Sequence, residues 1–198
     1  MSAAEKVWEK IAAAPARGFI AAAELPGSRR AVECELSRLA ADGDVLRVRK
    51  GLYWKGPKTR FGMASPRPAV IALEVGGPGA GPAEVSAAHL LGLTTQVPSV
   101  AVGAVPGRVP APVAGVRFVS RSIERRVVGL RPVEVALLEV LRIGPALIEK
   151  PWSSVGETVG RLVAAGDVRR DVLALALAGE HHVATRERWA EVTAMPTS

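Results

Sequence analysis

Residues 29–42 constrain the fold more than any other segment of the sequence. Their apolar members recur at the helical period of 3.6, so a helix here must bury one side against other regions of the chain. The Pro26-Gly27 turn and Ser28, a residue type that caps helix starts, precede the segment, and Gly43 ends it. The side expected to be buried holds Val32, Leu36, Leu39 and Ala40. The opposite side presents Arg29, Arg30, Glu33, Cys34, Ser37 and Arg38.

Two helical segments are expected before this one. Residues 4–14 place Val7, Trp8 and Ile11 on one apolar stripe, and Pro15 then stops the helix. Residues 19–25 are expected to form a short helical segment that ends at the Pro26-Gly27 turn. A helix, a short helix, a tight turn and a second amphipathic helix are typical of helix-turn-helix proteins, whose second helix enters the major groove of DNA.

A basic β-hairpin is expected immediately downstream. Residues 45–48 and 52–54 are two β-prone runs that flank the tripeptide Arg49-Lys50-Gly51. Such a hairpin can lie along a phosphate backbone or reach a minor groove. The sequence therefore predicts a winged helix-turn-helix DNA-binding domain over residues 1–60. The expected DNA contacts are Ser28, Arg29, Arg30, Glu33, Ser37, Arg38, Arg47, Arg49, Lys50 and Lys55.

Composition supports a polyanionic partner and an intracellular setting. The chain has a net charge of +7 and a pI near 10.3, and clustered basic residues release counterions when they bind phosphates. A single cysteine, Cys34, cannot form an internal disulfide, which favours a reducing compartment. The sequence has no signal-peptide pattern and no apolar run of membrane-spanning length. We therefore expect a cytoplasmic protein that does not bind membranes.

Residues 61–198 predict a second domain of mixed α+β type, so the whole chain is expected to be α+β. Residues 57–68 are expected to form a linker. Buried or paired strands are expected at 70–75, 97–102 and 116–120, with a loop at 76–82 and helices at 84–91, 130 onward and 169–178. Ser154 and Glu157 form a capping-box signature for a helix that reaches residue 165. The 169–178 helix is apolar on nearly all sides and is expected to be buried in the domain or against a partner.

Catalytic and metal-binding patterns are not found in the sequence. His181 and His182 are adjacent, so their side chains diverge on any regular element, and His89 has no neighbouring nucleophile or carboxylate pair. The glycine-rich segment 76–82 contains prolines and is not followed by Gly-Lys-Ser/Thr, as a phosphate-binding loop requires. We expect no enzyme activity, no metal and no cofactor.

Three segments resemble a known family. They are Leu36-Ser37-Arg38-Leu39 with the hairpin 46–54, the string Ser86-Ala87-Ala88-His89-Leu90-Leu91-Gly92-Leu93-Thr94-Thr95-Gln96-Val97-Pro98, and residues 134–142. Together they resemble the AbiEi-like antitoxins of type IV toxin-antitoxin systems. The resemblance implies an autorepressor that binds operator repeats of its own promoter through the winged helix. It also implies that the second domain counteracts a nucleotidyltransferase-like toxin. No block of that family is recognised beyond Gly144.

Two other classes of function stay open from the sequence. One is a winged-helix regulator whose second domain senses a ligand or dimerises. The other is a nucleic-acid-processing enzyme, although the chain lacks a clustered acidic pair for metal-assisted chemistry. Because one small module buries about 600–1,000 Å² on DNA, we expect the protein to occupy paired half-sites. The sequence shows no leucine-zipper repeat, so we expect a monomer in solution that pairs on DNA.

Overall fold

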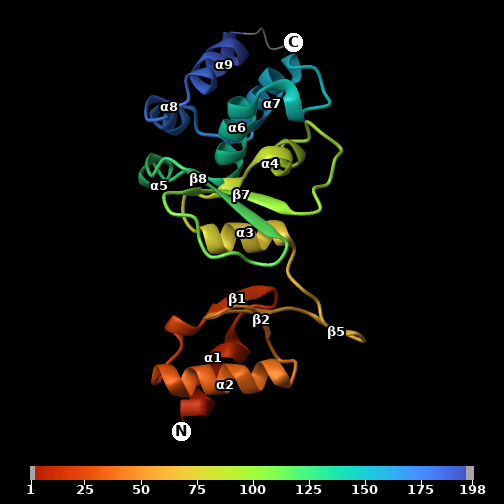
Figure 1. Ribbon diagram of the computed structural model, residues 1–198, viewed down its shortest axis with the longest axis vertical. Coiled ribbons are helices and arrows are strands. Elements are labelled where there is room, and N and C mark those ends of the chain that lie inside the picture. The colour runs from red at the N-terminus through yellow and green to blue at the C-terminus, as the bar shows by residue number, and fades with distance from the viewer. Residues whose placement is uncertain (1–2, 195–198) are drawn as a thin grey trace. The chain divides into compact units, whose positions relative to one another are not determined.

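The computed structural model describes residues 3–194, which divide into two units between Arg67 and Pro68. Both units combine helices with strands, so the expected α+β class is confirmed (Figure 1). Each unit has its own cluster of buried hydrophobic side chains. The division lies further along the chain than the domain boundary expected after residue 60.

The first unit packs helices against an antiparallel sheet of strand order β1-β3-β2. The buried cluster includes Val7 and Ile11 from the first helix and Val32, Leu36 and Leu39 from the second. The elements in chain order are α1 (Ala3–Ala13), β1 (Gly18–Ala21), the 3-10 helix η1 (Ala22–Glu24), α2 (Arg29–Ala41), β2 (Leu46–Arg49) and β3 (Leu52–Lys55).

Helix α2 begins and ends as its sequence predicts. The Ser28 hydroxyl accepts a hydrogen bond from the Ala31 N–H at 3.3 Å, which caps the first turn. At the other end Gly43 adopts a φ of +75°, and the Asp44 N–H donates to the Leu39 carbonyl at 2.8 Å. The apolar side is buried as expected, with Val32, Leu36 and Leu39 at most 2% exposed.

Residues 19–25 do not form the expected short helix. Residues 18–21 form strand β1, which pairs with β3, and only Ala22–Glu24 make a turn of 3-10 helix. Phe19 lies opposite Trp54, and their ring centroids are 4.9 Å apart. Aromatic and β-branched side chains suit a sheet surface, so pairing with a distant strand overrides the helix propensity of the neighbouring alanines. The expected hairpin of β2 and β3 is confirmed, with a register shift between Arg47 and Arg49.

The segment expected to be a linker forms a second small hairpin. Strands β4 (Lys58–Thr59) and β5 (Gly62–Met63) pair with each other and are anchored to the first unit. The Trp54 indole N–H donates to the Ala64 carbonyl at 2.9 Å, and the Ala64 N–H donates to the Pro57 carbonyl at 2.9 Å. These bonds give the segment a fixed conformation at least as far as Ala64.

The second unit has a mixed sheet between helical layers. Strand β6 is antiparallel to β7, and β7 is parallel to β8. Helix α3 lies on one face of the sheet, and α4 and α6 lie on the other (Figure 1). The elements are α3 (Pro68–Gly76), β6 (Gly81–Pro82), α4 (Glu84–Leu90), β7 (Ala101–Pro106), β8 (Val116–Arg121), α5 (Glu124–Val127), α6 (Pro132–Ile143), the 3-10 helix η2 (Pro145–Leu147), α7 (Ser153–Ala164), α8 (Arg170–Ala178) and α9 (Val183–Ala194).

Three sequence expectations fail in this unit. Residues 70–75 belong to helix α3, not to a strand, because a short apolar run does not distinguish a buried helix from a buried strand. Strand β7 begins at Ala101, so most of the expected strand 97–102 is not a strand. Helix α7 begins at Ser153 with no side-chain cap, so the capping box of Ser154 and Glu157 is wrong. A reciprocal capping bond occurs instead at α6, where Glu134 accepts from the Arg131 N–H at 2.7 Å.

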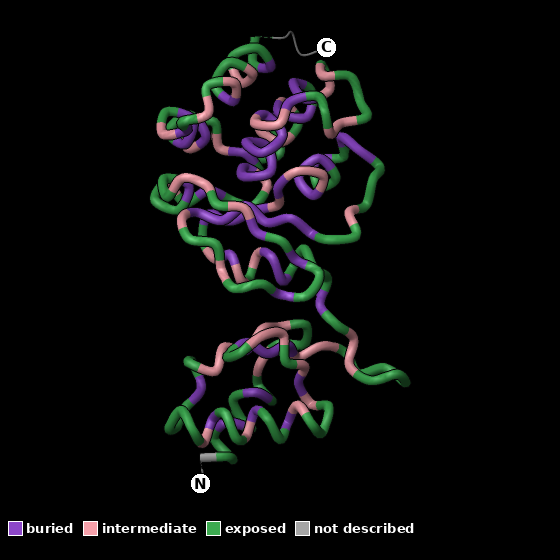
Figure 2. The backbone as a smooth tube through the Cα atoms, in the orientation of Figure 1, coloured by how far each residue is buried: buried purple, intermediate pink, exposed green. Residues whose placement is uncertain are grey.

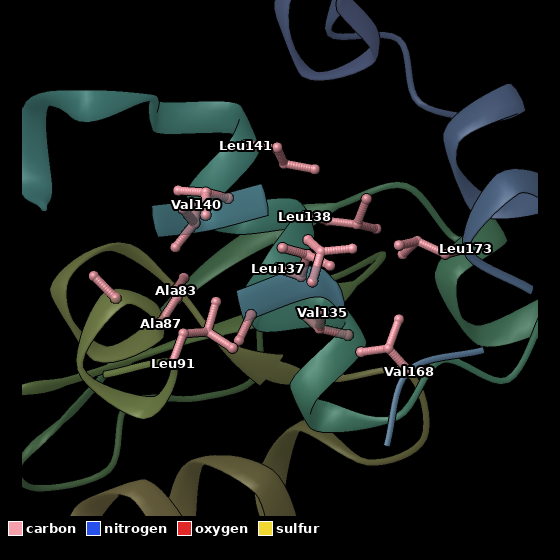
Figure 3. Close-up of a cluster of buried hydrophobic side chains, with 14 of the residues drawn as sticks. Ala83, Ala87, Leu91, Val135, Leu137, Leu138, Val140, Leu141, Val168 and Leu173 are labelled. Carbon is pink, nitrogen blue, oxygen red and sulfur yellow. The ribbon is translucent and has the colours of Figure 1, made fainter. Parts of the chain in front are cut away.

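Helix α6 is the centre of the second core. Figure 2 shows it as a mainly buried segment, and Figure 3 shows its side chains among those of α4 and α8. Val135, Leu137, Leu138 and Leu141 are 0% exposed. Helix α8 buries Leu173, Ala176 and Leu177, and Leu175 on its outer side is 63% exposed.

Candidate nucleic-acid interface

The outward side of α2 carries the residues expected to read DNA bases. Arg30 and Ser37 are exposed, and Arg30 makes no side-chain hydrogen bond or ion pair with any residue from 3 to 194. The Ser37 hydroxyl donates to the Glu33 carbonyl at 2.7 Å, and the Arg29 Nε donates to the Glu33 carboxylate at 3.0 Å. Arg29 and Glu33 therefore form an exposed ion pair, whereas Arg30 is unpaired among the described residues.

Arg38 is tied to two carboxylates of its own helix region. Its Nε and Nη2 donate to Glu35 at 3.2 and 2.6 Å, and its Nη1 donates to Asp42 at 2.7 Å. The hydrogen bond from Arg38 lowers the pKa of Glu35. Because more than half of the Arg38 side chain is exposed, these surface pairs contribute little to stability and can exchange for phosphate.

The β2–β3 hairpin places Arg47, Arg49 and Lys50 in different surroundings. Arg47 and Lys50 are exposed, and neither makes a side-chain hydrogen bond or ion pair with any described residue. Arg49 is half-buried, and its Nε is buried with no hydrogen-bond partner among residues 3–194. Arg47 and Lys50 are therefore the cations of this hairpin that face solvent freely.

Lys55 has a role inside the first unit that the sequence does not reveal. Its ammonium group donates to the carbonyls of Ile11, Ala12 and Ala14 at 2.8, 2.7 and 2.8 Å. These carbonyls lie at the C-terminal end of α1, where Pro15 follows and the helix leaves acceptors unpaired. Lys55 therefore caps α1 and is left out of the candidate DNA-contacting set.

The sequence reasoning missed two residues on the β4–β5 hairpin. Phe61 is 85% exposed, and the Arg60 guanidinium carbon lies 4.6 Å from the centroid of its ring. The signal was present as Gly62, which adopts a φ of +104° in a turn between two short strands. The surrounding prolines favoured a linker instead.

Basic charge is concentrated in the first unit. Residues 1–67 hold 13 of the 26 Lys and Arg residues but only 7 of the 19 Asp and Glu residues, a net charge of +6. Residues 68–198 hold 13 basic and 12 acidic residues, a net charge of +1. No Asp or Glu occurs between Val45 and Leu73, a stretch with seven basic residues. The electrostatic attraction to a polyanion therefore originates in the first unit.

In the second unit, arginines and glutamates form a buried network. Arg125 is 2% exposed and donates to Glu139 at 2.6 Å and to Glu180 at 2.8 Å. Arg121 binds Glu139 through two bonds of 2.7 Å, and Arg142 binds Glu180 at 3.1 Å. Burial by itself would raise the pKa of Glu180, but the hydrogen bond and charge of Arg125 outweigh it and lower that pKa. Buried carboxylates that are paired in this way hold the fold together.

Glu134 forms a second buried ion pair at the start of α6. Its carboxylate accepts bonds from the side chain and N–H of Arg169 as well as from Arg131. Burial raises the pKa of Glu134, but the Arg169 side chain and the two backbone N–H groups outweigh this effect and lower it. Glu134 thereby joins α6 to the segment that precedes α8.

Residues 3–194 contain no metal-ligand cluster and no helix that could span a membrane. No group of three or more His, Cys, Asp and Glu residues there is arranged to hold a metal ion. The Nδ1 of His182 pairs with the Thr185 hydroxyl at 3.0 Å. None of the described helices has the length and apolar character needed to cross a bilayer.

A cavity of about 620 Å³ lies in the second unit between the end of α4, the start of α6 and one side of α7. Its apolar lining includes Leu91, Val133 and Leu162, and its basic lining includes Lys150 and Arg161. Thr158 also lines it and is 7% exposed. A cavity of this size and mixed lining suits a small molecule.

No protein-family model and no curated protein matches the chain. Among solved structures, it is similar to the crystal structure of the RV2827C protein from Mycobacterium tuberculosis, with 18% sequence identity and a TM-score of 0.49. The match covers 96% of this chain and 75% of that chain. At this level the similarity carries no assignment of function.

Proposed function

We propose that the chain is a double-stranded-DNA-binding autorepressor whose first unit is a winged helix-turn-helix domain, and that it acts as a type IV antitoxin. The observation that carries the proposal is the concentration of charge. The first unit has a net charge of +6, and its unpaired cations Arg30, Arg47 and Lys50 lie on α2 and the adjacent hairpin. The strand order β1-β3-β2 with α2 before the hairpin is compatible with a winged helix.

In this proposal α2 enters the major groove and the hairpin contacts the backbone. Arg30 and Ser37 face base edges, and Arg47 and Lys50 neutralise phosphates. Arg29 and Arg38 release their carboxylate partners and turn to the DNA, at little cost because these pairs are exposed. Glu33 and Asp42 then disfavour poorly fitting sequences, because a carboxylate near a phosphate is repelled.

Support for the antitoxin activity comes from the resemblance of residues 86–98 and 134–142 to AbiEi-like proteins. In the structure these blocks hold elements of the second unit in place. Residues 134–142 lie in the buried helix α6. The Thr95 N–H and hydroxyl donate to the Glu149 carboxylate at 2.7 and 2.8 Å, which joins the first block to the chain after η2. The matching residues thus favour a shared second-unit fold more than a shared contact surface.

The test is a binding titration of the full chain on its own promoter at several salt concentrations. The variant Arg47→Ala/Lys50→Ala should weaken binding and reduce the salt slope by about two, because each phosphate contact contributes about 0.9. The control Arg170→Ala/Arg186→Ala removes the same charge from exposed, unpaired positions of the second unit and should change neither quantity. Equal slopes for both variants, or no preference for the promoter over competitor DNA, would overturn the proposal.

The 620 Å³ cavity favours a second candidate, a winged-helix regulator whose second unit senses a small ligand. The two candidates differ in their response to a toxin. Co-expression of the chain with a nucleotidyltransferase-like toxin from a neighbouring gene should restore growth if the chain is an antitoxin. Repression without rescue would favour the ligand sensor.

A further inference from the structure

The tip of the β4–β5 hairpin exposes an aromatic ring that no packing explains. Phe61 is 85% exposed, more than any other large hydrophobic side chain among the described residues. The Arg60 guanidinium carbon lies 4.6 Å from the centroid of the ring. Exposing a phenyl ring to water is unfavourable, so a partner that covers it would stabilise the assembled state.

The hairpin holds this ring in a defined position. The Thr59 hydroxyl donates to the Gly62 carbonyl at 2.8 Å and accepts from the Phe61 N–H at 3.2 Å, which fixes the turn. Lys58 binds Asp44 at 2.5 Å and ties the base of the hairpin to the chain that follows α2. A preorganised tip loses little conformational entropy when it binds.

The charge around the ring selects the class of partner. Arg60 lies beside the ring, Lys58 at the base of the hairpin is paired with Asp44, and the chain from Val45 to Leu73 has no acidic residue. A protein-binding aromatic would be expected among other apolar side chains, because interface cores are depleted in charge. A single apolar wedge among cations instead suits DNA, where such wedges enter the minor groove, unstack adjacent base pairs and kink the duplex.

We propose that the β4–β5 hairpin is a second DNA-contacting element, in which Phe61 inserts at a minor-groove base step and Arg60 binds a flanking phosphate. This inference rests on the proposed DNA-binding function and adds DNA bending to it. The operator of this protein is kinked at the step that Phe61 enters. Flexible pyrimidine–purine steps are favoured there, because they unstack at the lowest cost.

The experiment compares full-length variants on the promoter fragment, with affinity read by titration and bending by circularly permuted probes. Phe61→Ala should bind about tenfold more weakly and lose the bend, since it removes the wedge. Phe61→Leu keeps an apolar wedge and should retain most of the bend. Val127→Ala, at a side chain of the second unit that is 74% exposed, is the matched control and should behave as wild type.

The outcomes separate this inference from the proposed function. If wild type does not prefer the promoter, the proposed function fails. If wild type binds and Phe61→Ala binds with equal affinity and equal bend, the hairpin inference alone is overturned. It is also overturned if Phe61→Ala abolishes toxin rescue while leaving DNA binding and bending intact, because the ring would then contact a protein. Equal melting temperatures for Phe61→Ala and wild type are expected, since the side chain is 85% exposed.

Discussion

Replacing Arg125 with methionine should destabilise the second unit more than any other single change in its charge network. The side chain is 2% exposed and joins Glu139 to Glu180. Without it, Glu139 keeps two bonds of 2.7 Å from Arg121. Glu180 keeps only the 3.1 Å bond from the partly exposed Arg142 and a 3.4 Å bond from the His182 N–H. The main penalty is therefore a buried and poorly compensated charge at Glu180.

Removing one partner of a buried ion pair costs about 3–5 kcal/mol. For a domain of the size of the second unit, this lowers the melting temperature by about 10–18 °C. Arg142→Met is the matched control. Arg142 is 30% exposed and contributes one 3.1 Å bond to Glu180, which still has Arg125 at 2.8 Å. The control should therefore cost about 1 kcal/mol or less.

Differential scanning calorimetry of the full chain measures this effect, because each unit has its own hydrophobic cluster and can give its own transition. Arg125→Met should shift only the transition of the second unit. The double variant Arg125→Met/Glu180→Gln should recover much of the loss, since the unpaired charge is removed as well. A shift for Arg125→Met no larger than that for Arg142→Met would refute the reasoning, as would no recovery in the double variant.

Four further outcomes are expected. Lys55→Met should lower the stability of the first unit by about 2 kcal/mol, because three carbonyls at the end of α1 lose a charged donor. The control Lys50→Met should leave the calorimetric transition of the first unit unchanged. The second unit should be stable at pH 6 and should lose stability as the pH falls below about 4.5. The folded state lowers the pKa of Glu134 and Glu180, and the stability that their ion pairs contribute disappears when these carboxylates are protonated. Constant stability down to pH 3 would contradict this prediction. A fragment of residues 68–198 should fold and rescue cells from the toxin without binding the promoter, and a folded fragment without rescue would contradict the division of labour. Footprinting should show two protected half-sites near multiples of a helical turn, and full repression from one half-site would exclude pairing.

The features of the fold that depend on residues close together in the sequence were predicted correctly. Ser28 caps α2, Gly43 terminates it, and the 3.6-residue pattern identifies its buried side, because each depends on residues within a few positions. Elements that depend on distant partners were missed. Strand β1 exists because it pairs with β3, some 35 residues later, and the hydrophobic run of α3 was ambiguous without its sheet.

The candidate site shows the same limit at the level of single side chains. A sequence gives the type of a residue but not what its polar atoms contact. Lys55 and Lys50 are both basic residues of one hairpin. Lys55 caps α1, whereas the Lys50 side chain is exposed and makes no hydrogen bond or ion pair with any described residue. Phe61 was missed because the prolines around it favour a linker. The hairpin that exposes Phe61 is held by hydrogen bonds of the Trp54 and Thr59 side chains, which the sequence does not reveal.

The two units differ in how deeply their paired arginines are buried. In the second unit Arg121 and Arg125 direct their donors to buried glutamates, so a phosphate would have to break pairs whose desolvation is already complete. In the first unit Arg30 and Arg47 have no carboxylate partner among the described residues, and Arg38 has only exposed ones. The two units hold equal numbers of basic residues, but buried ion pairs and a nearly equal number of acidic residues leave the second unit with a net charge of only +1, so we expect the DNA-binding surface in the first unit.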